Sequence, residues 1–446
     1  MTVRSRTNEK SDSHDENMNR ENMNRLWGGL WRPLVALPVL GLITSLGFAL
    51  PLGVAIISAG SHSATAAPAS DKRFRQWVER LWPSARRKGV SRHVFNTAFR
   101  GVLPDPEVIR SAHYQPEFVR PVWDYLASAA SDRRIEVGTA MLRENKNLFD
   151  RLEKRFKVDR YVIVAIWGME SNFGLNMGNQ NVIRSLATLA YRDRRRRKFG
   201  RQQLLSALKI LQRGDISAAK MKGSWAGAMG HTQFIPTTYS AYAVDFTGDG
   251  KRDIWNSPTD ALASTANYLH KSNWRFGHAW GYEIKLPKKM KSARTRLKRR
   301  KNLSYWKKLG LKRVNGKDFP RLGDKAALYL PAGRKGPAFL VLNNFRSVLR
   351  YNNAATYALA VGHLSDRLRG SGPFVTSWPT KHKPLARDER LELQRLLTAK
   401  GFDTGGTDGV IGNATMHAVR KYQKSRGLKV DGWPSARVLK TLRNDS

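Results

Sequence analysis

The sequence contains no cysteine among its 446 residues. This absence excludes disulfide bonds, thiol nucleophiles and cysteine-ligated zinc, and it also excludes a lipid anchor on an N-terminal cysteine. Acidic residues are scarce as well, since 35 Asp and Glu stand against 79 Lys and Arg, which gives a formal net charge of +44. Such a charge attracts polyanions, whether nucleic acid, anionic lipid or an acidic wall polymer, and does not choose among them.

Charged residues are also absent from residues 33–70, a largely apolar stretch that follows a basic segment ending near Arg32. The small residues ATAAPA at 64–69 offer an Ala-x-Ala cleavage site of the secretory kind. The apolar run exceeds the roughly 7 to 15 residues of an ordinary signal core, so an uncleaved inner-membrane anchor is an alternative. Residues 1–70 are therefore expected to be a cytoplasmic tip with a signal peptide or signal anchor, which places the rest in the periplasm or cell envelope.

Composition shifts divide the remaining chain into a large unit, a linker and a small unit. Residues 71–370 carry apolar side chains mostly at three- and four-residue spacing, which predicts helices. The apolar stretch 326–341 is interrupted by proline and glycine, and it predicts a small pair of strands. Residues 371–384 hold three prolines and are expected to be a linker that leads into a compact unit at 385–446.

Two strongly basic runs occur in the large unit, at 194–198 and 288–301. Neither run has the interleaved aromatic residues on which the bases of a single-stranded nucleic acid stack. A solvated helix face and a surface loop are therefore the simpler interpretation. Attraction to an anionic wall polymer suffices to explain the runs, and no nucleic-acid partner is expected.

The segment 158–174 places a single glutamate at the end of an apolar helix. Apolar residues recur at helical spacing up to Met169, and Asn172 and Gly174 are helix-stop signals. Glu170 thus falls in the last turn, where the helix dipole and apolar neighbours disfavour its ionised form and raise its pKa. A carboxylic acid that keeps its proton near neutral pH suits general-acid cleavage of a glycosidic bond. For a glutamate in an arbitrary helix, capping or ion pairing is the commoner role.

From about Phe74 to Leu364 the chain resembles the B-type membrane-bound lytic murein transglycosylases, glycoside hydrolase family 103. The matching blocks read AIWGMESNFG at 165–174, SLATLA at 185–190, GSWAGAMGHTQFIPTTY at 223–239, ANYL at 266–269 and YALAV at 357–361. The resemblance implies a lysozyme-like, mainly α-helical catalytic domain with a small β element. It also implies that Glu170 protonates the oxygen between N-acetylmuramic acid and N-acetylglucosamine and then accepts the C6 hydroxyl proton, which closes a 1,6-anhydro ring.

The same resemblance implies a set of sugar-binding residues: Ser224, Gln233 and Phe234 lining the subsites, with Tyr268 and Asn352 near the catalytic carboxyl. Amide side chains suit acetamido and hydroxyl groups because they both donate and accept hydrogen bonds. The matching segment around Glu170 holds no second Asp or Glu, whereas a double-displacement or inverting glycosidase needs a second acid about 5 to 9.5 Å away. Folding could still bring such an acid from elsewhere in the chain.

Residues 245–256 follow the first half of an EF-hand calcium loop. Asp245, Thr247 and Asp249 offer oxygen ligands at alternate positions, whereas the twelfth position is Asn256 instead of glutamate. Some members of the family bind a cation at this place, so a structural Ca²⁺ is one hypothesis and a plain Asp/Gly turn is the other. No cofactor is expected for the reaction itself.

The unit at 385–446 resembles the type 1 peptidoglycan-binding domain, a three-helix bundle, with Asp-Gly turns at 408–409 and 431–432. The predicted fold class is thus mainly α, with this bundle as a second domain. A wall-docking module raises the local concentration of a polymeric substrate, and peptidoglycan is the expected partner. A catalytically silent wall-binding scaffold is the alternative function. The exported N-terminus argues against a third interpretation, a nucleic-acid-binding protein.

Overall fold

The computed structural model describes residues 67–113, 121–287, 290, 297–380, 385–409, 411, 413–428, 430 and 432–445. The expected export segment lies almost entirely before these residues. Across the described ranges, none of the helices combines the length and apolar character needed to cross a membrane.

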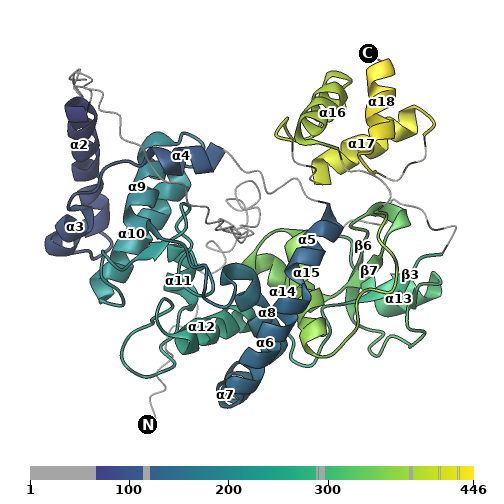
Figure 1. Ribbon diagram of the computed structural model, residues 1–446, viewed down its shortest axis with the longest axis horizontal. Coiled ribbons are helices and arrows are strands. Elements are labelled where there is room, and N and C mark those ends of the chain that lie inside the picture. The colour runs from purple at the N-terminus through teal and green to yellow at the C-terminus, as the bar shows by residue number, and fades with distance from the viewer. Residues whose placement is uncertain are drawn as a thin grey trace, which may run out of the picture.

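Helices make up most of the described chain (Figure 1). In chain order they are α2 (Ala67–Arg86), α3 (Arg92–Phe99), α4 (Pro106–His113), α5 (Val122–Ala129), α6 (Asp132–Glu144), α7 (Lys146–Phe156), α8 (Arg160–Ser171), α9 (Val182–Arg192), α10 (Arg197–Arg213), α11 (Pro236–Tyr242), α12 (Pro258–Lys271), α13 (Leu303–Lys308), α14 (Asn343–Tyr351), α15 (Ala355–Leu368), α16 (Arg387–Ala399), α17 (Asn413–Ser425) and α18 (Ala436–Asn444). Several begin at a side chain that accepts a backbone N–H of the first turn, namely Ser91, Ser131, Asn181, Ser257 and Ser435. The predicted mainly α fold is confirmed.

The strands form one small sheet and one short ladder. They are β1 (Gln180–Asn181), β2 (Lys222–Gly223), β3 (Gly281–Lys285), β4 (Lys301–Asn302), β5 (Lys312–Arg313), β6 (Lys325–Tyr329) and β7 (Ala338–Val341). β1 pairs with β2, and the other five make an antiparallel sheet in the order β4-β6-β7-β3-β5. The predicted strand pair is β6 and β7, which are antiparallel neighbours. The sheet is wider than predicted because three further strands join it.

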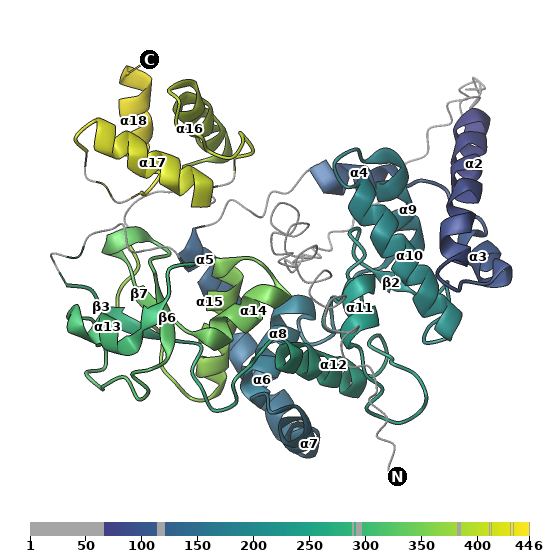
Figure 2. The same ribbon diagram turned by 180° about the vertical axis from the view of Figure 1, so that it is seen from behind.

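Helix α8 forms the centre of the large domain. All eight residues from Val162 to Met169 are buried, as expected for a helix that is apolar on every side. It packs against α6, α7, α12 and α15, and it lies among them in both views (Figures 1 and 2). A helix enclosed in this way fixes the position of whatever side chain stands at its end.

The five-stranded sheet has its own hydrophobic core, separate from the helical one. Trp306 on α13 is fully buried in it, together with Leu303, Leu328 and Leu340. The indole N–H of Trp306 donates to the Ala326 carbonyl at 3.0 Å and so ties α13 to β6. The sheet and α13 therefore form a distinct lobe beside the helices (Figure 1).

Residues of the predicted linker pack against the large domain. The Phe374 ring stacks on the His363 ring with centroids 3.9 Å apart, and the N–H groups of Val375 and Thr376 donate to Glu283. Beyond the linker, α16, α17 and α18 form the predicted three-helix bundle around a small core that includes Leu393, Val419, Tyr422 and Leu439.

Candidate active site

Glu170 stands in the last turn of α8, as the stop signals predict. The helix ends at Asn172, which adopts a left-handed backbone conformation with φ of 50°. The Asn172 N–H donates to the Gly168 carbonyl at 3.2 Å, and the Phe173 N–H donates to the Trp167 carbonyl at 3.3 Å. These bonds close the helix and present the Glu170 side chain at its carboxyl end.

Glu170 as a residue is partly exposed, whereas its carboxyl group is buried in the surrounding protein. Burial raises its pKa from 4.5 to about 8, while the hydrogen bond from Tyr357 lowers it. The Tyr357 hydroxyl, at the start of α15, donates to Glu170 Oε1 at 2.5 Å. Glu170 is therefore protonated at neutral pH and is held in place by one phenol.

Two more tyrosines lie near Glu170, and no role was expected for either of them from the sequence. Tyr125 on α5 has a buried hydroxyl without a hydrogen-bond partner among the described residues, and Tyr351 at the end of α14 donates to the Thr232 carbonyl at 2.5 Å. Burial and the negative field of Glu170 raise the pKa of both phenols. They remain hydrogen-bond donors at any physiological pH.

The sequence pointed to two of the three tyrosines near Glu170 but not to the third. Tyr357 begins the YALAV block of the resemblance, and Tyr351 directly precedes Asn352, so both could have been singled out. Tyr125 lies in no recognised block, and only the fold brings α5 beside α15.

The loop that carries the block 223–239 folds back on itself beside the end of α8. The Ser224 hydroxyl accepts the Ala228 N–H at 3.0 Å. The Gln233 side-chain amide donates to the Met177 and Gly230 carbonyls, both at 2.9 Å. Gln233 thus joins this loop to the loop that follows α8.

His231 links the same loop to the helix that bears Glu170. The Ser171 hydroxyl donates to the His231 carbonyl at 2.5 Å, and the Trp167 indole N–H donates to His231 Nδ1 at 3.2 Å. Burial lowers the pKa of His231, so its ring is neutral and can accept this bond. Gly174 has φ of +92°, and a Cβ there would lie 2.4 Å from the His231 ring, which explains the glycine that ends the AIWGMESNFG block.

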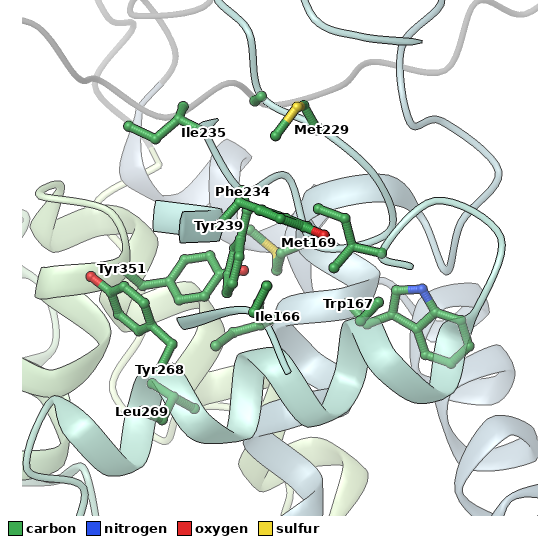
Figure 3. Packing of buried hydrophobic residues seen from close by; sticks show 14 of the residues in the cluster. Ile166, Trp167, Met169, Met229, Phe234, Ile235, Tyr239, Tyr268, Leu269 and Tyr351 are labelled. Carbon is green, nitrogen blue, oxygen red and sulfur yellow. The ribbon is translucent and has the colours of Figure 1, made fainter. Parts of the chain in front are cut away.

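Phe234 and Tyr268 are buried and pack in one hydrophobic cluster with Tyr351 (Figure 3). The Phe234 ring is 1% exposed and lies 5.8 Å from the Tyr351 ring and 6.0 Å from the Tyr268 ring. The Tyr268 hydroxyl donates to the Arg350 carbonyl. These aromatic residues hold the end of α14 in place and present little surface to a sugar in this conformation.

Asn352 follows directly after Tyr351 and is almost completely buried. Its Oδ1 atom has no hydrogen-bond partner in the described part of the chain. A buried amide oxygen without a donor is costly, and a ligand N–H or O–H would relieve that cost.

No second carboxylate within the described ranges lies close enough to Glu170 to shift its pKa. The isolation of Glu170 agrees with a scheme in which one residue handles both proton transfers.

The candidate cation loop brings together three carboxylates: oxygens of Asp245, Asp249 and Asp260 lie within 4.8 Å of one another. Asp260, which lies beyond a standard EF-hand loop, enters through the first turn of α12. Asp245 Oδ1 accepts the Gly248 N–H at 2.6 Å and the Thr247 hydroxyl at 3.2 Å. Three carboxylate oxygens that lie this close together suit Ca²⁺, which prefers oxygen ligands.

Comparison with known proteins agrees with this geometry. Residues 73–366 match the family described as Transglycosylase SLT domain, and residues 386–442 match the family described as Putative peptidoglycan binding domain. The chain is 30% identical over 235 residues to membrane-bound lytic murein transglycosylase B of Escherichia coli (strain K12), a match that covers 52% of this chain and 62% of that protein. It thus spans about three-fifths of that relative's length.

Among solved structures, SltB3 from Pseudomonas aeruginosa in complex with NAG-anhNAM-pentapeptide is 52% identical with a TM-score of 0.78, covering 83% of this chain and 99% of that one. The Escherichia coli lytic transglycosylase Slt35 in complex with calcium is 25% identical with a TM-score of 0.58, covering 68% and 94%. The chain therefore belongs to the transglycosylase SLT domain family and carries a C-terminal peptidoglycan-binding domain.

Proposed function

We propose that this protein is a lytic murein transglycosylase. It cleaves the β-1,4 bond between N-acetylmuramic acid and N-acetylglucosamine in peptidoglycan and leaves 1,6-anhydromuramic acid ends. The observation that carries this proposal is the lone carboxyl of Glu170, whose pKa is raised to about 8 and which accepts a hydrogen bond from Tyr357.

In the first step, the protonated Glu170 donates its proton to the bridging oxygen as the glycosidic bond breaks. Glu170 is then a carboxylate, and the Tyr357 hydroxyl stabilises that charge through the bond to Oε1. In the second step, Glu170 accepts the proton of the muramic acid C6 hydroxyl while the oxygen attacks C1. The enzyme ends in its starting protonation state, and no water is consumed.

Binding of the sugar is proposed for the residues around this carboxyl. The unpaired amide oxygen of Asn352 suits the N–H of an acetamido group, and Ser224 and Gln233 lie on the loop that folds against the end of α8. The C-terminal bundle holds the polymer near the site. The periplasm or cell envelope is the proposed location, with the inner membrane as a further contact if the leader stays uncleaved.

Mass spectrometry of the products tests the proposed function. Digestion of purified sacculi should release muropeptides that end in 1,6-anhydromuramic acid, which are lighter by one water than hydrolysed products. Hydrated reducing ends as the main product would instead identify a hydrolase, and the absence of any product would favour the silent scaffold.

We also propose that the loop 245–260 binds a structural Ca²⁺. The convergence of Asp245, Asp249 and Asp260 supports this, and so does the relative Slt35, whose structure was solved in complex with calcium. The ion would neutralise carboxylates whose mutual repulsion raises the pKa of Asp260 in addition to its burial.

Addition of Ca²⁺ to chelator-treated protein is therefore expected to raise Tm by about 5 °C at saturating calcium. Asp249→Asn should reduce this rise because it removes one negative charge from the three carboxylates that would hold the ion. Asp403→Asn is the matched control, since both carboxylates accept the N–H of the second residue after them, from Lys251 and Gly405. Equal Tm with and without calcium in the unmodified protein would refute the site.

A further inference from the structure

The lobe formed by the small sheet carries a hollow of about 460 Å³ on its β4 side. Its lining residues are Arg300, Lys301, Asn302, Ser304, Tyr305, Lys308 and Lys325. Four of these are cations and none is acidic. The hollow collects the end of the basic run 288–301 and two lysines that follow it in the chain, Lys308 and Lys325.

The positive charge of this hollow is not balanced by the protein. None of its four cations forms an ion pair with any residue that the structure describes. Lys308 and Lys325 are exposed. An anion that enters the hollow would therefore meet cations that are not already neutralised.

Arg300 forms the fixed floor of the hollow. Its Nη2 donates to the Lys325 carbonyl at 2.9 Å, while its Nε is buried without a hydrogen-bond partner in the described ranges. Burial and the like charges of Arg346 and Arg275 lower the pKa of Arg300. The nearby Asp324 already interacts with Arg275 and His278, so an unsatisfied cationic donor remains.

The sheet that carries the hollow is connected to the active site through β7 and α14. β7 runs beside β6, and after Leu342 the chain enters α14, which ends at Tyr351 and Asn352. Arg346, which lies on α14, is one of the cations that act on Arg300. The sheet that carries the hollow is therefore joined directly to the helix that ends at Tyr351 beside the glycan site.

We propose that this hollow binds the carboxylates of the peptide stems that hang from the glycan strand. This inference rests on the proposed function, because it concerns the same polymer. The stems carry several carboxylates on an extended chain, and the cations here are spread over a hollow with Asn302, Ser304 and Tyr305 as neutral donors. A single phosphate would engage only part of such a surface.

The double variant Lys301→Gln/Lys325→Gln tests this proposal. The two lysines lie on the paired strands β4 and β6. We expect a roughly tenfold rise in KM for peptide-bearing strands at low ionic strength, with kcat unchanged, because the lost contacts bind substrate without touching the reacting bond. Strands stripped of their peptides by an amidase should be cleaved equally by the variant and the unmodified protein.

Lys285→Gln/Lys312→Gln is the matched control. These lysines are also exposed and paired in register, but on β3 and β5 at the opposite edge of the same sheet. The control should keep the original KM on both substrates. Equal losses in the two double variants, or an equal loss on peptide-free strands, would overturn the proposal in favour of a general charge effect.

Binding of a free stem pentapeptide separates this proposal from the proposed function. Calorimetry with the Glu170→Gln protein should detect the pentapeptide without any cleavage, and Lys301→Gln/Lys325→Gln should weaken that binding about tenfold. If inorganic phosphate binds the hollow and the pentapeptide does not, the site is a phosphate site and the inference fails. If the pentapeptide binds but the unmodified protein cleaves no strands, only the proposed function is rejected.

Discussion

Replacement of Glu170 by glutamine is expected to reduce the release of anhydromuropeptides by about 10³-fold or more. Glutamine has nearly the same shape but can neither give nor accept the proton, and proton transfer by a positioned group contributes roughly 10² to 10⁴-fold to a rate. In the proposed scheme both transfers depend on one carboxyl, and no other carboxylate is among the groups that shift the pKa of Glu170. The measurement is the initial rate of product release from sacculi by mass spectrometry.

Glu144→Gln is the control for this substitution. Glu144 is an exposed residue at the end of α6, so its loss should change neither activity nor stability. Both variants should bind sacculi as the unmodified protein does, because the C-terminal bundle is untouched. Undiminished product release by Glu170→Gln would refute the assignment of Glu170.

The same variant should be more stable than the unmodified protein in alkaline solution. The pKa of Glu170 is 4.5 as its ordinary value and about 8 in the fold, so the folded state holds a proton that the unfolded state releases between these pH values. The stability that the protonated group provides is fully present below about pH 4.5 and is lost as pH rises through about 8. Glutamine has no such loss, and we expect its advantage to grow by about 3.5 kcal/mol between pH 5 and pH 8. Urea unfolding at pH 5 and pH 8 measures it.

Replacement of Tyr357 by phenylalanine is expected to lower kcat by about 10- to 100-fold. Its hydroxyl donates to Glu170 Oε1, and a hydrogen bond to a charged group is worth about 1.5–3 kcal/mol. The bond stabilises the carboxylate that exists between the two steps. Tyr357 contacts the Glu170 carboxyl through its hydroxyl, so we assign it a positioning role.

The pH profile separates this role from a merely structural one. The hydrogen bond from Tyr357 lowers the pKa of Glu170, so its removal should move the alkaline limb of the kcat/KM profile from about pH 8 to higher pH. Tyr422→Phe is the matched control, since Tyr422 donates to the Asp445 carboxylate in the C-terminal bundle. An unmoved alkaline limb in Tyr357→Phe would contradict the proposed partnership with Glu170.

Local sequence patterns were sufficient to predict the position of Glu170 and most of the helices. Apolar spacing followed by Asn172 and Gly174 placed the glutamate in a last helical turn, and the helix ends there. The sheet was harder to predict because β4 and β5 are two-residue strands made of Lys, Asn and Arg. Such strands have no apolar alternation, and only their pairing with longer neighbours defines them.

The groups that surround the Glu170 carboxyl could not be predicted from local sequence patterns. Tyr357 is 187 residues away from Glu170 in sequence, and Asp260 joins Asp245 only because α12 begins beside the loop. Phe234 was expected to line a sugar subsite, and the structure places its ring in the core at 1% exposure. The sugar-binding roles of the whole predicted set stay predictions: Ser224, Gln233, Phe234, Tyr268 and Asn352.

The sequence by itself determined that Glu170 ends an apolar helix, that the chain is mainly helical and that a compact unit follows a proline-containing linker. These properties depend on residues within a few turns of one another, where spacing and stop signals act directly. The sequence also predicted a raised pKa for Glu170, but only the tertiary structure decided that burial raises it as far as about 8, that Tyr357 holds the carboxyl, and that four cations share one hollow. Desolvation and charge depend on what surrounds a group in space, and those neighbours come from segments that are far apart in the chain.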